Sequence, residues 1–164
     1  MAPLARIGIS QCLLGDNVRY DGGHKRDSFL IETLGPHVEW VPVCPEVEIG
    51  MGTPREAMRL AGDPRAPRLV TITSGTDHTE AMARFSQRRV RELEALNLSG
   101  YVFKADSPSC GIGGVPLGVG LFAQAFMAHF PLIPVEDEDH LHDPQAVRSF
   151  LERALGYRQS RNNI

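Results

Sequence analysis

Short apolar runs rich in β-branched residues alternate with amphipathic stretches along most of the chain, and this alternation restricts the possible folds more than any other feature. Strands are predicted at residues 4–10, 38–43, 68–73, 101–104 and 132–135, and helices at 25–34, 77–96, 121–129 and 143–155. Strands that alternate with helices of this length form right-handed βαβ units. The pattern therefore predicts an α/β, Rossmann-like three-layer sandwich with a mostly parallel sheet.

Local signals give the expected helix ends. Gly35 and Pro36 stop the first helix, because proline cannot continue it. Asp77, with Glu80 three residues later, resembles a capping box. Asp143 before a proline predicts an N-cap for the last helix. With no internal repeat and no interior linker, residues 1–156 are expected to form a single domain and residues 157–164 a flexible C-terminal tail.

Composition excludes several classes of protein. The 164 residues are 42% hydrophobic and 23% charged, with a net charge of −3 and a sequence pI of about 6.1. This is the profile of a globular domain without the basic excess of an electrostatic nucleic-acid binder. No run approaches membrane-spanning length and no secretory signal is present, so we expect a cytoplasmic protein without a membrane partner. The oligomeric state is open.

The three cysteines have the placement expected of a shared site. Cys12 follows the first predicted strand, Cys44 follows the second, and Cys110 lies in a Gly/Ser/Pro-rich loop after the fourth. Ligands of open parallel sheets bind beyond the carboxyl ends of the strands. A single free cysteine is usually a buried core residue. Three in loops at one sheet edge instead indicate a metal or cluster site.

The spacing leaves two kinds of site open. A structural zinc site needs four ligands, usually with close pairs such as CxxC, and no such pair exists. Three thiolates favour an iron–sulfur cluster with one iron left open, which suits Lewis-acid chemistry. The competitor is a Cys₃His zinc site completed by His24 or His78.

Polar residues beside the cysteines supply candidate catalytic and binding groups. Glu46, two residues after Cys44, is a candidate general acid or base. Ser107 and Ser109 place two hydroxyls next to Cys110, although serines in such loops often serve as turn donors.

Two further segments receive different expectations. Ser74 and Gly75, ahead of a helix N-terminus, could hold an anion or a polar base edge. The acidic, histidine-containing segment 136–143 is expected to be a solvated loop.

The motifs around the cysteines resemble a known family. They are Cys-Leu-Leu-Gly at 12–15, Val-Arg-Tyr-Asp-Gly at 18–22, Cys-Pro-Glu at 44–46 followed by Gly50, Pro54 and Arg55, and Lys104 with Ser-Pro-Ser-Cys-Gly at 107–111. Together they are similar to the TudS-type thiouracil desulfidases. Residues 118–153 resemble the form of this domain that is found fused to a second domain, so the chain could be a stand-alone protein or part of a fusion.

The resemblance implies a 4Fe-4S cluster on Cys12, Cys44 and Cys110, and a hydrolytic, non-redox desulfuration of 2- or 4-thiouracil to uracil and sulfide. The substrate sulfur would bind the open iron, and Glu46 and Ser107 would be the catalytic residues. Ser74, Gly75 and Ser109 remain candidate substrate-binding residues. A desulfidase of thiolated nucleosides or tRNA, or a non-catalytic zinc or redox-sensing module, are the alternatives.

Overall fold

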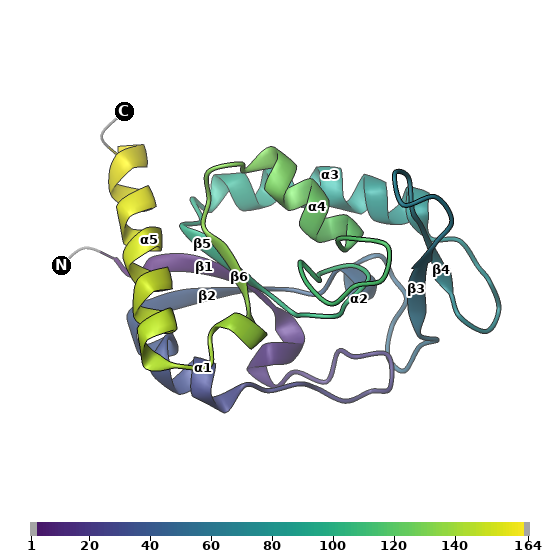
Figure 1. Ribbon diagram of the computed structural model, residues 1–164, viewed down its shortest axis with the longest axis horizontal. Helices are drawn as coiled ribbons and strands as arrows, with labels where there is room; N and C mark the ends of the chain where they lie inside the picture. The colour runs from purple at the N-terminus through teal and green to yellow at the C-terminus, as the bar shows by residue number, and fades with distance from the viewer. Residues whose placement is uncertain (1–2, 163–164) are drawn as a thin grey trace.

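A parallel sheet of four strands lies at the centre of the computed structural model, which describes residues 3–162 (Figure 1). The strands are β1 (Ala5–Ser10), β2 (Val38–Val43), β5 (Gly100–Phe103) and β6 (Val135–Asp137). Their order is β2-β1-β5-β6 and every pair is parallel. The chain leaves β1 toward one side of the sheet and later returns to the other side. This reversal places the topological switch point between β1 and β5.

Helices cover both faces of the sheet. The pair α3 (Thr79–Ala95) and α4 (Leu121–His129) packs on one face, and α1 (Ser28–Thr33) and α5 (Pro144–Asn162) pack on the other (Figure 1). Buried aromatic side chains such as Phe85, Phe103 and Phe122 fill the first interface, and smaller aliphatic side chains with Phe150 fill the second. The predicted α/β three-layer sandwich is therefore confirmed.

Short helices occupy the strand ends and connections. They are α2 (Pro45–Glu48) after β2 and the 3₁₀ turns η1 (Gln11–Leu14), η2 (Gly35–His37) and η3 (Glu138–His140). None of the helices in the described part of the chain combines the length and apolar character needed to cross a membrane.

The strand predicted at residues 68–73 is real but belongs to a different sheet. It forms β4 (Arg68–Thr71), which pairs antiparallel with β3 (Met58–Ala61), an element that the sequence analysis missed. Exposed and buried residues alternate along β3, as in a hairpin covered on one side only, whereas all four residues of β5 are buried. A strand inside a parallel sheet is buried on both faces, so this difference separates the two environments.

Two element boundaries differ from the prediction. The last strand lies at 135–137 rather than 132–135, and Leu132 is largely exposed. Helix α5 continues to Asn162, so the expected tail is wrong for residues 157–162; residues 163 and 164 lie outside the described part. Gly156 costs a helix only about 1 kcal/mol. Packing of Tyr157 on the core and a 2.8 Å hydrogen bond from Arg161 to the Leu98 carbonyl support the extra turns.

The predicted helix caps had mixed outcomes. Asp143 accepts a 2.9 Å hydrogen bond from the Ala146 amide and caps α5 as expected. The capping box of α3 is wrong, because Glu80 pairs with Arg68 instead of reaching back to the helix start. Asp77 accepts from the Thr79 amide at 2.9 Å and from Arg68 Nε at 2.8 Å.

Candidate functional site

The three cysteines meet at the carboxyl edge of the sheet, as the strand order requires. Cys12 lies in η1 directly after β1, Cys44 directly follows β2, and Cys110 lies in the loop after β5. These three strands are neighbours, and the switch point falls between two of them. All three cysteines line one cavity of about 360 Å³. Residues separated by nearly one hundred positions are thus brought to a single site.

The thiols are buried and influence one another. Burial, and then the neighbouring Cys44, raise the pKa of Cys12 to about 11. Burial also raises the pKa of Cys44 and of Cys110, and the other two thiols raise that of Cys110 further. Thiols with raised pKa values are protonated at neutral pH. Metal loading at this site therefore has to displace protons.

The donor set fits a cluster better than a single ion. Four ligands on one zinc at about 2.3 Å bring the sulfur atoms to within roughly 3.8 Å of one another. Among the described residues, no three His, Cys, Asp or Glu side chains are grouped closely enough to hold one metal ion. His24 and His78, the predicted fourth ligands, do not line the cavity. Three thiols around an open cavity match the wider spacing of ligands on a multi-iron cluster.

Cys44 is held by the start of α2. It is the N-cap residue, Pro45 occupies the first helical position, and the Glu48 carboxylate accepts a 3.0 Å hydrogen bond from the Cys44 amide. Glu48 in turn pairs with Arg89 on α3 at 3.2 Å. Sequence reasoning assigned no role to Glu48 or Arg89, because Glu48 lies four residues after the N-cap, one more than the spacing of a capping box.

The loop before Cys110 is fixed by Ser107. Its hydroxyl oxygen accepts hydrogen bonds from the amides of Cys110 at 3.0 Å and Ser109 at 3.3 Å. Glycine allows a second segment to pack directly on this loop. A Cβ added at Gly120 would lie 2.5 Å from the Ser109 carbonyl carbon. Gly111, where an added Cβ would lie 2.7 Å from the Ser107 carbonyl oxygen, and Gly120 thus serve close backbone packing.

Glu46 is a partly buried carboxylate with a partner on each oxygen. Oε1 accepts from Arg55 Nε at 2.9 Å, and Oε2 accepts from the Ser109 hydroxyl at 3.0 Å. The side chains of Glu46 and Arg55 are only 12% and 6% exposed. Arg55 also donates to the Gly52 carbonyl at 2.9 Å. Sequence reasoning found Glu46 and Ser109 but gave Arg55 no role.

Two predicted substrate-binding residues lie elsewhere. Ser74 and Gly75 form the turn after β4 and do not line the cavity. The Ser74 amide is bound by the Glu56 carboxylate. Their prediction assumed that the strand before them belonged to the central sheet, and the separate hairpin removes that reason.

Comparisons with known proteins agree with this arrangement. The sequence matches the family model described as 2-thiouracil desulfurase over residues 7–138. The chain belongs to this family. It is 33% identical over 112 residues to the uncharacterized protein YbbK of Bacillus subtilis (strain 168), covering 65% of this chain and 74% of that protein. It is also similar to the solved structure of a [4Fe-4S]-dependent thiouracil desulfidase, TudS. That match has a TM-score of 0.71 and 32% identity, and covers 88% of this chain and 97% of the other.

Proposed function

We propose that the chain removes sulfur from a thiouracil, either 2- or 4-thiouracil, by a non-redox hydrolysis that yields uracil and sulfide. The observation that carries this proposal is the convergence of three buried thiols and a paired carboxylate on one cavity at the sheet edge. Family membership and the likeness to a [4Fe-4S]-dependent thiouracil desulfidase support the same reaction.

Cys12, Cys44 and Cys110 would hold a 4Fe-4S cluster. When bound, such a cluster supplies a Lewis-acidic iron without a protein ligand, on which a thiocarbonyl sulfur can be polarised. The overall reaction balances without electron transfer. The oxygen of water bonds to the ring carbon, the carbon–sulfur bond breaks, and both protons of water end on sulfide.

Glu46 is suited to the proton transfers of this reaction. Its carboxylate lies at the cavity wall and is held in place by the ion pair with Arg55. When ionised, it can take a proton from the attacking water and return it to the departing sulfur. Arg55 is then a positioning residue for Glu46.

Ser107 and Ser109 extend Glu46 by a chain of hydroxyl groups. The Ser109 hydroxyl donates to Glu46, so the 3.1 Å contact between the two serine hydroxyls has Ser107 as its donor. The Ser107 oxygen accepts from two backbone amides, and its O–H group remains to donate to Ser109. Hydrogen bonds in this direction suit transfer of a proton to the Glu46 carboxylate. In this proposal Ser107 is a catalytic residue and Ser109 links it to Glu46.

Anaerobic reconstitution with iron and sulfide, followed by assay of uracil and sulfide, tests the proposal. Turnover of 2- or 4-thiouracil with about four irons per chain, the content of one cubane, is the expected result. An iron-loaded protein that leaves both free bases unchanged would contradict it and point to thiolated nucleosides or tRNA. Binding of zinc in preference to iron would contradict the cofactor assignment.

A further inference from the structure

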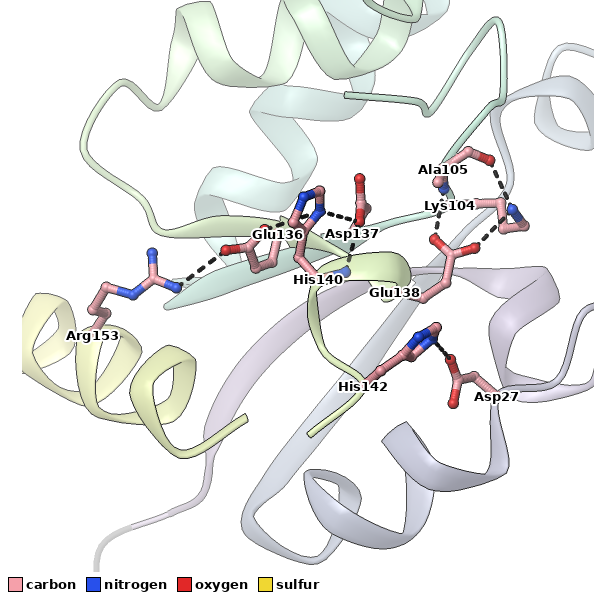
Figure 2. Close-up of polar contacts among 9 residues, drawn as sticks. All are labelled: Asp27, Lys104, Ala105, Glu136, Asp137, Glu138, His140, His142 and Arg153. Carbon is pink, nitrogen blue, oxygen red and sulfur yellow. Dashed lines mark hydrogen bonds and ion pairs between the residues drawn. The ribbon is translucent and has the colours of Figure 1, made fainter. Parts of the chain in front are cut away.

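A second ion pair lies beside the cavity, on the side away from Glu46 and Arg55. Lys104 follows β5 and Glu138 follows the neighbouring strand β6, and their charged atoms are 2.7 Å apart (Figure 2). The other oxygen of Glu138 accepts from the Ala105 amide at 2.7 Å, and Lys104 Nζ also donates to the Ala105 carbonyl at 2.7 Å. Figure 2 shows that each of Lys104, Ala105 and Glu138 contacts the other two.

Like the Glu46–Arg55 pair, this ion pair is buried. The side chains of Lys104 and Glu138 are 14% and 9% exposed, whereas those of Arg153 and Glu136, which pair nearby, are 48% and 27% exposed. The expectation of a solvated acidic segment is therefore wrong at Glu138. Removing two charges from water is costly, so a buried pair is weak evidence for a role in stability alone.

The two members of the ion pair differ in their position relative to the cavity. Lys104 and Ala105 line it, whereas Glu138 lies behind them. A lysine ammonium has three N–H groups, and two acceptors in the described part of the chain take two of them. Lys104 thus presents a fixed cation and one further N–H to the cavity.

We propose that Lys104 is a substrate-binding residue and that Glu138 is its positioning residue. The third N–H of Lys104 donates to the carbonyl oxygen that a thiouracil carries in addition to its thiocarbonyl group. This assignment rests on the proposed function and names the contact that fixes the orientation of the base in the cavity.

The test compares iron-loaded wild type with Lys104→Met, Glu138→Gln and the double variant. Glutamine at 138 keeps an acceptor for the Ala105 amide while removing the charge that fixes Lys104. Glu136→Gln is the matched control, because it removes a more exposed ion pair from a glutamate two residues away, on β6. For each protein we would measure iron content, KM and kcat for 2-thiouracil, and the dissociation constant of uracil by calorimetry.

Loss of a charge-assisted hydrogen bond predicts that KM and the uracil dissociation constant rise about tenfold or more in both single variants. Iron content and kcat should change little, and Glu136→Gln should behave like wild type. Adding Glu138→Gln to Lys104→Met should cause no further loss of uracil affinity, because the two residues act as one unit. Lys104→Met leaves the buried Glu138 carboxylate without its partner and could fold poorly for that reason. The double variant removes this carboxylate and then takes its place in the test.

A substrate analogue without the carbonyl oxygen, pyrimidine-2-thione, provides the sharper test. Its affinity should be nearly the same for wild type and Lys104→Met. Equal losses for the analogue and 2-thiouracil, or unchanged uracil affinity with lower iron content or thermal stability, would overturn the proposal. Failure of the proposed function would appear separately, as absence of turnover in wild type, and uracil affinity would still decide the role of Lys104.

Discussion

Replacing Glu46 with glutamine separates its chemical role from its structural role. The variant keeps an oxygen that can accept from Arg55 but has no negative charge and cannot take a proton. General acid–base groups contribute about 10²- to 10⁴-fold, which is about 3–5.5 kcal/mol in activation free energy. We therefore expect kcat to fall by that factor with the cluster retained, measured as sulfide and uracil release by protein of known iron content.

The structure sets the cost of the same change in stability. The Glu46–Arg55 contact is almost fully buried, so solvent screens it weakly. A hydrogen bond to a charged group is worth about 1.5–3 kcal/mol and a neutral one about 0.5–1.5, so the change should cost about 1 kcal/mol. For a chain of this size that is a fall of about 2–4 °C in Tm. A domain of ordinary stability stays about 99% folded after such a loss, so unfolding cannot explain the loss of activity.

Arg55→Met is the matched control. It breaks the same pair from the other side and leaves a partly buried carboxylate without its cation, a change that typically costs 3–5 kcal/mol. The methionine variant should therefore be less stable than Glu46→Gln yet more active, measured at low temperature with equal iron content. If Arg55→Met were instead both less stable and less active than Glu46→Gln, Glu46 would be a structural residue and the assignment of the proton transfer would be wrong.

Three other predictions test the site and the fold. Replacing any one of the three strand-end cysteines with alanine should abolish cluster retention; full iron content in one variant would remove that residue from the ligand set. Gly120→Ala should shift the loop at Ser109 and weaken iron retention, because the new Cβ meets backbone, whereas Gly156→Ala on α5 meets nothing within 4 Å and should stabilise by about 0.5–1 kcal/mol; equal thermal scans and iron contents would contradict this. Asp137 raises the pKa of His140 above 6.5, so their attraction stabilises the folded state below that pH and is lost as pH rises through the folded-state pKa. The difference in urea midpoint between wild type and His140→Gln should accordingly shrink from pH 5.5 to pH 8, and a constant difference would refute the link.

The sequence predicted the central sheet and the place of the cysteines because both depend on local patterns. The strands β1, β2 and β5 are short runs of mainly apolar residues, and each cysteine follows one of them within ten residues. The carboxyl ends of parallel strands lie at the same edge of a sheet. Residues that directly follow the strands are therefore expected to be close together even when no contact is known. Glu46 and Ser107 then follow from their closeness to the cysteines in the chain.

The remaining parts of the site depend on contacts between distant segments, which no local pattern contains. Glu138 belongs to an acidic stretch in which buried and exposed residues are mixed, and only the pairing of β5 with β6 brings it to Lys104, 34 positions away. The same limit explains the misplaced hairpin strand. Four residues of β4 suffice to predict a strand, but they do not specify which sheet it joins.

Two of the segments at the carboxyl edge are anchored to other elements by ion pairs within the protein. Glu48 ties the start of α2 to Arg89 on α3, and Glu138 ties the segment after β5 to the end of β6. Small zinc domains differ, because they lack a core and fold only on binding metal. Here two hydrophobic interfaces and these anchors shape the cavity, so we expect the cluster-free chain to unfold cooperatively in urea. Cluster loading should raise the midpoint mainly by binding to a cavity that the folded chain already contains. A cluster-free chain that showed no cooperative transition would mean that the anchors are too weak to shape the site.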